Sequence, residues 1–345
     1  MIAKRPTIAD LARASGVSVA TVDRVLNARL PVREHTARRV YKAATEIGFH
    51  AAGLIGQRLH RELPEYRLGF LLLRPKDPFY RAFATELTEA VSQSQQFRGA
   101  ASIDFTESLA VEEIVDRLRR LAAGSHALAL VSPDHPMLTA AVKELKERGI
   151  PVFALLSDFA NGVRDGYVGV DNMKVGRTAA WMIANSAGKG GKVALFVGSH
   201  RFHGHELREI GFRAFFRENA PGFTVMETFV NQESYQATHE ALTALLEQHN
   251  DLAGCYIAGG GAEGGISALR QVAPEAPRPV MVCNEITADR RAALAEGLLT
   301  MVIDTPLRPL CTELVALMAS ALEKGAAAAP GQTFIPFGIY LPESI

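Results

Sequence analysis

The chain has 345 residues, of which 48% are hydrophobic and 21% are charged, a composition typical of a folded protein with more than one domain. No apolar run approaches the roughly 20 residues of a membrane span, and the first ten residues lack the apolar segment of an export signal. The three cysteines, Cys255, Cys283 and Cys311, are dispersed without a C-x-x-C spacing. We therefore expect a protein that is neither exported nor membrane-bound, with buried reduced thiols and no metal.

Charge is distributed unevenly along the chain, although the formal net charge is zero. Residues 1–62 contain 11 Lys and Arg against 5 Asp and Glu, so this segment carries +6 and the remainder carries −6. A basic first module suits a polyanionic partner such as nucleic acid. On charge alone, a solvated helical surface that happens to be basic is an equal alternative.

The first predicted elements are two short helices that meet at Ser15–Gly16. Thr7 is placed to cap the first helix, in which Ile8, Leu11 and Ala12 share one face. Gly16 permits the sharp turn that a residue with a β-carbon would resist. This arrangement predicts a helix-turn-helix unit over residues 8–27.

The second of these helices has a polar face suited to DNA. Ser18 is a favourable N-cap, and Val22, Val25 and Leu26 fall on the inward face at helical spacing. The opposite face presents Val19, Ala20, Asp23, Arg24 and Asn27. Short and hydrogen-bonding side chains near a helix N-terminus can enter the major groove of DNA.

A third amphipathic helix is predicted over residues 32–47 and ends at Gly48. The run G-V-S-x-x-T-V-x-R-V-L-N at residues 16–27 closely resembles the DNA-reading helix of the LacI-type (lactose repressor family) regulators. The segment T-A-R-R-V from Thr36 and the pair Gly48–Phe49 match the third helix of that family. The resemblance implies an all-α DNA-binding domain over residues 1–49.

The resemblance also implies a function for this domain. It indicates a cytoplasmic transcriptional regulator, a repressor, that binds a palindromic operator as a homodimer. The family commonly has Ser at the position of Asp23. The Asp23 carboxylate either accepts a hydrogen bond from a cytosine or pairs with Arg24, and we favour the pairing. Base contacts are expected from Val19, Ala20 and Arg24, and DNA-backbone contacts from Thr7, Ser18, Thr21, Asn27, Arg33 and His35.

Residues 50–65 are predicted to link this domain to the rest of the chain. Gly53 and Gly56 each cost a helix about 1 kcal/mol relative to Ala, so the segment should not form a stable helix alone. In the family the matching segment folds on DNA, which would place Leu59 as a wedge in the minor groove. The segment is one residue longer than the family pattern and lacks its usual Pro, and a flexible tether is the alternative.

Residues 66–345 alternate between strand and helix, which predicts parallel sheets covered on both faces. The order of elements resembles a periplasmic-type (type I) sugar-binding domain. We expect two doubly wound α/β subdomains, over 66–170 with 304–330 and over 171–303 with 331–345. Strands are predicted at 68–73, 101–105, 127–131, 152–156, 168–170, 193–197, 224–230, 254–258, 280–283 and 301–303. Helices are predicted at 81–95, 111–122, 137–148, 174–187, 207–218, 234–248 and 307–324.

Candidate ligand residues follow these strands, because ligands bind at the carboxyl ends of strands in such sheets. Asp77 offers a carboxylate to hydroxyl groups, while Phe79 and Tyr80 offer flat faces to the C–H groups of a sugar. In the family, Arg208 matches a ligand-binding Arg. The full expected set is Asp77, Phe79, Tyr80, Asp134, Asp158, Arg208, Glu285 and Asp304. So many carboxylates predict an acidic pocket for a small sugar, a polyol or an amino-bearing ligand, and disfavour a sugar phosphate.

Two other functions compete with this interpretation. Gly259-x-Gly261-x-x-Gly264 follows a strand and precedes a predicted helix, and Glu285 ends the next strand, which is the spacing of a dinucleotide site in an NAD(P)-dependent oxidoreductase. However, no catalytic set of Lys, His and Tyr stands out, and His200, His203 and His205 are interpreted as exposed loop residues. A solute-binding receptor is the third possibility, opposed by the DNA-binding motif. We therefore predict a protein that is not an enzyme and uses no cofactor.

Overall fold

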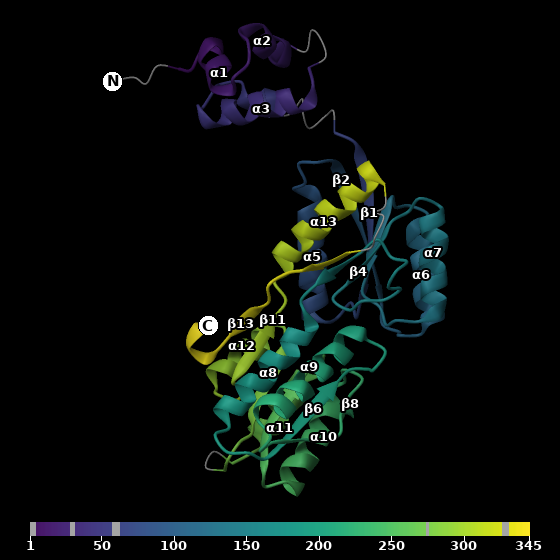
Figure 1. Cartoon of the computed structure of the whole chain (residues 1–345), viewed down its shortest axis with the longest axis vertical. Helices are drawn as coiled ribbons and strands as arrows, with labels where there is room; N and C mark the ends of the chain where they lie inside the picture. Colours follow the sequence, from purple (N-terminus) through teal and green to yellow (C-terminus); the bar gives the residue numbers. More distant parts are fainter. Residues whose placement is uncertain (1–4, 28–31, 57–62, 274–275, 326–330) are drawn as a thin grey trace. The chain divides into compact units, whose positions relative to one another are not determined.

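The computed structural model describes residues 5–27, 32–56, 63–273, 276–325 and 331–345 (Figure 1). It contains two compact units, Met1–Tyr66 with Gln93–Gly99, and Arg67–Ser92 with Ala100–Ile345. Within the described ranges, no helix has both the length and the apolar character needed to cross a bilayer. The two units are considered separately below.

The first unit contains α1 (Ile8–Ser15), α2 (Val19–Asn27) and α3 (Glu34–Glu46). Thr7 and Asp10 form a capping box at the start of α1, and Gly16 ends the helix with φ +66°. The three helices enclose a small core that includes Leu11, Val22, Val40, Ala44, Phe49 and Ile55. Ile8 shares a helix face with Leu11 and Ala12, but its side chain is exposed whereas theirs are buried.

Part of the predicted linker packs on this core. Residues 52–56 are helical, and Ile55 is buried. Gly56 lies so close to the ring of Tyr41 that a β-carbon would come within 2.8 Å of it. The beginning of the linker is therefore folded in the structure, and Leu59 lies outside the described residues.

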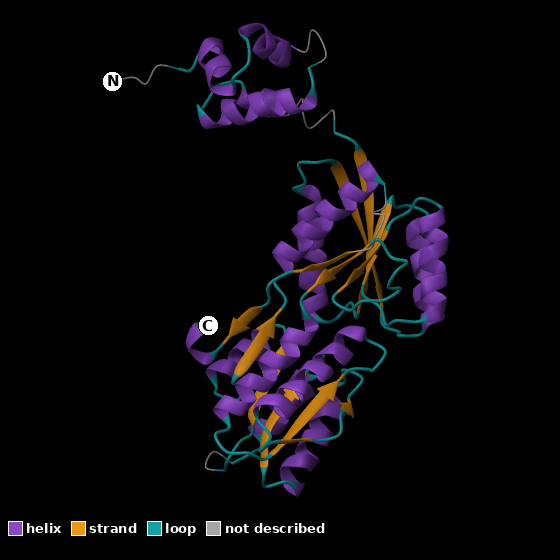
Figure 2. Ribbon diagram, in the orientation of Figure 1, coloured by secondary structure: helices purple, strands orange, loops and turns teal. Residues whose placement is uncertain are grey.

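The first lobe of the second unit is built on a six-stranded sheet in the order β12-β5-β4-β3-β1-β2. Helices α6 and α7 pack on its buried residues over one face, and α5 and α13 pack against each other over the other face (Figure 2). The strands are β1 (Glu65–Leu73), β2 (Arg98–Thr106), β3 (Ala127–Leu130), β4 (Val152–Leu155), β5 (Gly166–Gly169) and β12 (Gly331–Phe334). The helices are α5 (Pro78–Ser92), α6 (Val111–Ala122), α7 (Pro136–Glu147) and α13 (Leu307–Lys324).

The second lobe has a sheet in the order β13-β11-β10-β9-β6-β7, and β8 also pairs with β6. Helices α8 and α9 cover one face, and α10, α11 and α12 cover the other. The strands are β6 (Lys192–Val197), β7 (Thr224–Val225), β8 (Phe229–Val230), β9 (Leu252–Ile257), β10 (Val280–Asn284), β11 (Met301–Asp304) and antiparallel β13 (Gly338–Tyr340). The helices are α8 (Asn172–Ser186), α9 (His203–Asn219), α10 (Tyr235–Gln248), α11 (Ala262–Arg270), α12 (Ala288–Ala295) and the 3-10 turn Pro342–Ser344.

The chain passes between the lobes three times: after β5, after β11, and between β12 and β13. The last passage differs from the predicted boundary at residue 331. Strand β12 pairs in parallel with β5, and Arg164 Nη1 donates to the carbonyl of Gly331 at 2.9 Å. Residues 331–334 therefore belong to the first lobe. The predicted α/β fold with two doubly wound lobes is confirmed, and Cys255, Cys283 and Cys311 are buried free thiols.

Candidate functional site

The exposed face of α2 carries the residues expected to meet DNA. The hydroxyl of Ser18 accepts from the Thr21 amide at 3.2 Å, which fixes the start of the helix. Val19 is 53% exposed, and Ala20 and Arg24 lie on the same surface. Of the other expected contacts, Thr7, Asn27, Arg33 and His35 are exposed and Thr21 is half-buried.

Asp23 does not form the favoured pair with Arg24. Its Oδ1 accepts from Asn27 Nδ2 at 2.6 Å, one helical turn further along α2. Residues four apart face each other on a helix, whereas adjacent residues do not, which explains the choice of partner. The Arg24 guanidinium is exposed beside this pair.

A cavity lies between the two lobes at the carboxyl ends of their parallel strands, where ligand residues were expected. It encloses about 670 Å³ of space, counting its mouth. The walls combine aromatic, acidic and basic side chains from both lobes. They consist of Asp77, Phe79, Tyr80, Val131, Leu156, Ser157, Phe202, Gly204, His205, Arg208, Glu233, Gly259, Gly260, Asn284, Glu285 and Arg290.

Three predicted ligand residues in this wall come from the turn after β1 and the first turn of α5. Asp77 Oδ1 accepts from the Phe79 amide at 2.8 Å, which orients the carboxylate at the start of α5. The rings of Phe79 and Tyr80 meet edge to face, with centroids 5.3 Å apart. Burial raises the pKa of the Tyr80 phenol well above its ordinary value, so the hydroxyl is neutral and can donate or accept.

Two more predicted residues reach the wall from the second lobe. Arg208 Nε donates to Asn172 Oδ1 at 2.7 Å, and its Nη1 donates to the carbonyl of Ala258 at 2.5 Å. Glu285 accepts from the amide and hydroxyl of Thr305 at 3.0 and 2.9 Å, just before the chain returns to the first lobe. Burial raises the pKa of the Glu285 carboxyl. Arg208 is therefore held by the start of α8 and the residue after β9, and Glu285 is held by the residue after β11.

The three remaining predicted carboxylates do not line the cavity. Asp134 accepts from the Ala160 amide at 3.0 Å. Asp158 forms a buried pair with Arg164 at 2.5 and 2.6 Å, and the two side chains are 4% and 1% exposed. Asp304 accepts from the Ile286 amide at 2.9 Å, and burial raises its pKa to about 7. Each of these carboxylates is engaged in bonds within the protein.

Among the charged and titratable residues, the sequence analysis missed His205, Glu233 and Arg290 in the wall and Arg74 beside it. Arg74 lies at the end of β1, and its Nη2 is 3.0 Å from Glu233 Oε2. His205 lies in the first turn of α9 and is 12% exposed, so the interpretation of it as an exposed loop residue is wrong. Burial lowers its pKa to about 3, which keeps the imidazole neutral.

The cavity wall carries charges of both signs and is less acidic than predicted. Its wall contains the carboxylates of Asp77, Glu233 and Glu285 and the guanidinium groups of Arg208 and Arg290. Outside the wall, Arg74 pairs with Glu233 and Glu263 pairs with Arg290 at 3.0 Å. Of the five predicted carboxylates only Asp77 and Glu285 lie in the wall, because Asp134, Asp158 and Asp304 are bonded elsewhere, and carboxylates outnumber guanidinium groups in the wall by one.

The glycine motif after β9 packs against protein side chains. Gly259 lies against the His205 ring, and Gly260 lies against the Glu233 side chain. Gly264 approaches the carbonyl of Tyr235 so closely that a β-carbon has no room, which lets α11 pack on α10. The carboxylates of Glu233 and Glu263 lie near the start of α11, where a dinucleotide would place its pyrophosphate. The spacing therefore reflects packing, and like charge disfavours a dinucleotide there.

Comparison with known proteins matches both units. Residues 7–51 match the model of bacterial regulatory proteins, lacI family, and residues 68–326 match the periplasmic binding protein domain. The HTH-type transcriptional regulator GalS of Salmonella typhimurium is 24% identical over 269 residues, covering 76% of this chain and 75% of GalS. An uncharacterized HTH-type transcriptional regulator in the aml 5′ region of Streptomyces limosus is 28% identical over 227 residues, covering 60% and 57%.

Among solved structures, the fold is similar to GanP, a glucose-galactose binding protein from Geobacillus stearothermophilus. The TM-score is 0.71 at 17% identity, and the match covers 81% of this chain and 99% of GanP. At this identity the likeness concerns the fold alone. The larger part of the chain belongs to the periplasmic binding protein domain family, and with the lacI-type domain at residues 7–51 the protein is a DNA-binding transcriptional regulator.

Proposed function

We propose that a neutral monosaccharide or polyol binds in the cavity between the lobes and changes the affinity of the regulator for its operator. The observation that carries this proposal is a wall that combines the carboxylates of Asp77, Glu233 and Glu285 with the guanidinium groups of Arg208 and Arg290. Such a wall supplies both acceptors and donors, which suits an uncharged polyhydroxylated ligand. The excess of carboxylates over guanidinium groups disfavours a sugar phosphate.

The aromatic residues support the same ligand class. Phe79 and Tyr80 line one side of the cavity from the first lobe, and Phe202 lines it from the second. Flat apolar surface beside carboxylate and guanidinium groups is the combination that binds the C–H faces and hydroxyl groups of a sugar together. The named function of GanP as a glucose-galactose binding protein fits this class. We assign the direct contacts to Asp77, Phe79, Tyr80, Arg208 and Glu285.

We further infer how the ligand is coupled to DNA. The wall contains residues of both lobes, so a bound ligand stabilises one arrangement of the lobes relative to another. If the body dimerises, that arrangement sets the spacing of two α2 helices on the half-sites of a palindromic operator. A coupling of about 1–3 kcal/mol between the two sites is typical of such regulators. We place this activity in the cytoplasm, where the DNA lies.

Two measurements test the proposal. Thermal unfolding is followed with D-glucose, D-galactose, D-allose, L-arabinose, D-xylose, D-fructose, myo-inositol and D-glucosamine, with NADH as a separate probe. A bound compound at 100 times its Kd should add about 2.7 kcal/mol of stability. Operator sequences are then selected from random DNA, and their affinity is measured by fluorescence anisotropy with and without the compound.

Each outcome has a defined meaning. Stabilisation by a neutral sugar or polyol, and a changed operator affinity in its presence, supports the proposal. Stabilisation by D-glucosamine alone contradicts the neutral ligand class, and stabilisation by NADH alone contradicts the sugar-binding cavity. Selected operators without twofold symmetry would contradict the homodimer.

A further inference from the structure

The strongest unexplained feature of the second unit is a group of strained backbone conformations around the cavity. Among the described residues, six that are not glycine have positive φ: Arg74, Leu156, Ala160, Gln232, Glu233 and Glu285. Leu156, Glu233 and Glu285 line the cavity, and Arg74 contacts residues 232 and 233. A left-handed conformation costs an ordinary residue free energy and persists only where its surroundings hold it, so such residues often mark functional sites.

Arg74 joins the two lobes through a single loop of the second lobe. Its Nη1 donates to the carbonyl of Glu233 at 3.2 Å, its Nη2 donates to the carbonyl of Gln232 at 3.0 Å, and the same Nη2 is 3.0 Å from Glu233 Oε2. Arg74 is 27% exposed and Glu233 is 12% exposed, so water screens this pair only weakly. The guanidinium thus fixes both the backbone and the carboxylate of Glu233.

The second lobe also positions Glu233, through hydrogen bonds and close packing. The buried amide of Asn231 donates to the carbonyl of Gly260 at 2.9 Å, and its Oδ1 accepts from the Glu233 amide at 2.8 Å. Gly198 and Gly260 both lie against the Glu233 side chain, and a β-carbon at Gly260 would come within 2.8 Å of it. The glycines after β6 and β9 therefore leave room for this one side chain.

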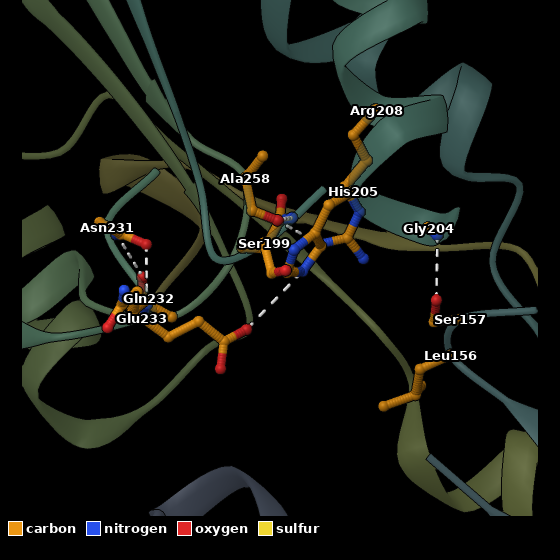
Figure 3. A network of polar contacts seen from close by, with 12 residues as sticks. Leu156, Ser157, Ser199, Gly204, His205, Arg208, Asn231, Gln232, Glu233 and Ala258 are labelled. Carbon is orange, nitrogen blue, oxygen red and sulfur yellow. Dashed lines mark hydrogen bonds and ion pairs between the residues drawn. The ribbon is translucent and has the colours of Figure 1, made fainter. Parts of the chain in front are cut away.

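Glu233 faces His205 inside the cavity, as Figure 3 shows. The distance from His205 Nε2 to Glu233 Oε1 is 3.7 Å, too long for a direct hydrogen bond. Gly259 lies against the His205 ring and leaves room for it in the wall. In the Nε2–H tautomer of His205, a hydroxyl oxygen at about 2.7–2.9 Å from each group would accept from the imidazole Nε2–H and donate to the carboxylate.

We propose that Glu233 and His205 together bind one hydroxyl group of the effector, and that Arg74 is the residue that positions Glu233 for this contact. This inference rests on the proposed sugar-binding function and assigns a specificity determinant within it. Because Arg74 comes from the first lobe and Glu233 from the second, this hydroxyl site is complete only when the lobes are together. Gly259 and Gly260 serve this site by leaving space for the His205 and Glu233 side chains.

The test uses the full chain and titration calorimetry. A parent sugar that binds the wild type is compared with its single-deoxy analogues, for example D-galactose with 2-deoxy-D-galactose and 6-deoxy-D-galactose. In the wild type, one analogue should bind at least tenfold more weakly than its parent, because a buried carboxylate loses its hydroxyl partner. The parent sugar should bind Glu233→Gln at least tenfold more weakly than it binds the wild type. The ratio of the Kd of that same analogue to the Kd of the parent should be smaller in Glu233→Gln than in the wild type.

Two further variants separate positioning from stability. Arg74→Met should weaken binding of the parent sugar about as much as Glu233→Gln, and Arg74→Lys should restore part of the affinity. The double variant Arg74→Met with Glu233→Gln should bind the parent sugar no more weakly than either single variant, because both substitutions remove the same contact. Arg119→Met is the matched control: it removes an ion pair with Glu144, 2.9 Å apart, within the first lobe. Its sugar affinity should equal that of the wild type.

The outcomes distinguish this inference from the proposed function. If the wild type binds none of the sugars, the proposed function fails and this inference fails with it. If the wild type binds a sugar and both Arg74→Met and Glu233→Gln bind it equally well, the inference is overturned while the sugar cavity stands. A lower melting temperature of Arg74→Met with unchanged sugar affinity also overturns the inference, because the ion pair then only joins the lobes.

Discussion

Gly176 of α8 lies directly against the backbone carbonyl of Arg208 in α9, and no β-carbon fits between them. A second close approach, of Gly211 in α9 to the carbonyl of Met173 in α8, repeats the contact one turn away. These glycines bring the two helices together so that Arg208 Nε reaches Asn172 Oδ1 at 2.7 Å. The position of a cavity side chain thus depends on a residue that does not touch the cavity.

Gly176→Ala should therefore weaken sugar binding as well as stability. The added methyl group forces α8 and α9 apart, at a cost of about 1–3 kcal/mol, and moves Arg208 relative to Asn172. Thermal unfolding measures the first effect, and titration with a bound sugar measures the second, for which we expect at least a tenfold loss. Gly124→Ala is the control, because Gly124 has no heavy atom within 4 Å of its β-carbon position. Unchanged affinity in Gly176→Ala would show that Arg208 is not positioned by this helix contact.

The buried pair between Asp158 and Arg164 should be essential for stability. Arg164→Met leaves the Asp158 carboxylate buried without its partner, which typically costs about 3–5 kcal/mol. Arg164 also binds the Gly331 carbonyl, so β12 loses an anchor at the same time. Chemical unfolding of the full chain measures the loss, and Asp158→Leu with Arg164→Met should recover part of it. A stable Arg164→Met variant that no longer binds sugar would instead place Asp158 in ligand recognition.

The DNA-binding unit could be predicted from the sequence because its signals are local. Thr7 and Ser18 cap their own helices, and Gly16 supplies the left-handed turn between them. The strands of the second unit were also found, since buried parallel strands read as continuous apolar runs. Strand 224–230 divides into β7 and β8, and α12, β12 and β13 were not anticipated. Short polar or amphipathic segments of this kind are fixed by their neighbours rather than by their own pattern.

The cavity was predicted only in part, for a related reason. Glu285 directly follows β10 and Asp77 lies in the turn after β1, so ligand binding at strand ends places both in the wall. Asp158 follows a strand as well, but Arg164 binds it six residues later, and nothing local shows that this arginine is buried. Glu233 is held in the cavity wall by hydrogen bonds from Arg74, which is 159 residues away in sequence. The glycine run 259–261 was the available signal for His205 and Glu233, and it was interpreted as a possible phosphate loop.

Asp304 should make the stability of the protein depend on pH. Burial, followed by the nearby charge of Glu285, raises its pKa from 3.8 to about 7 in the folded state. A raised carboxyl pKa means that the folded protein favours the neutral form, so this group's contribution to stability falls as the pH rises from about 4 to 7. Asp304→Asn should therefore raise the melting temperature relative to the wild type most strongly above pH 7, with little difference near pH 4.

The matched control for this experiment is Asp116→Asn, because Asp116 is exposed on α6. Its melting temperature should differ from that of the wild type by the same small amount at every pH. In Asp304→Asn the side-chain carbonyl oxygen can still accept from the Ile286 amide, so the comparison isolates the charge. A gain in Asp304→Asn that is equal at pH 4 and pH 8 would contradict a raised pKa.

Arg24 and Arg33 should affect DNA binding in different ways if α2 lies in the major groove. Arg24→Ala removes a base contact, so affinity for the selected operator should fall by about 1–3 kcal/mol and preference should relax at one base pair. Arg33→Ala removes a phosphate contact, so the affinity for every DNA sequence should fall by the same factor. The magnitude of the slope of log affinity against log salt concentration should decrease by about one per half-site. Fluorescence anisotropy at several KCl concentrations, on the selected operator and on single-base variants, separates the two effects. Arg119→Ala in the first lobe should change neither, and a uniform loss in Arg24→Ala would reassign Arg24 to the DNA backbone.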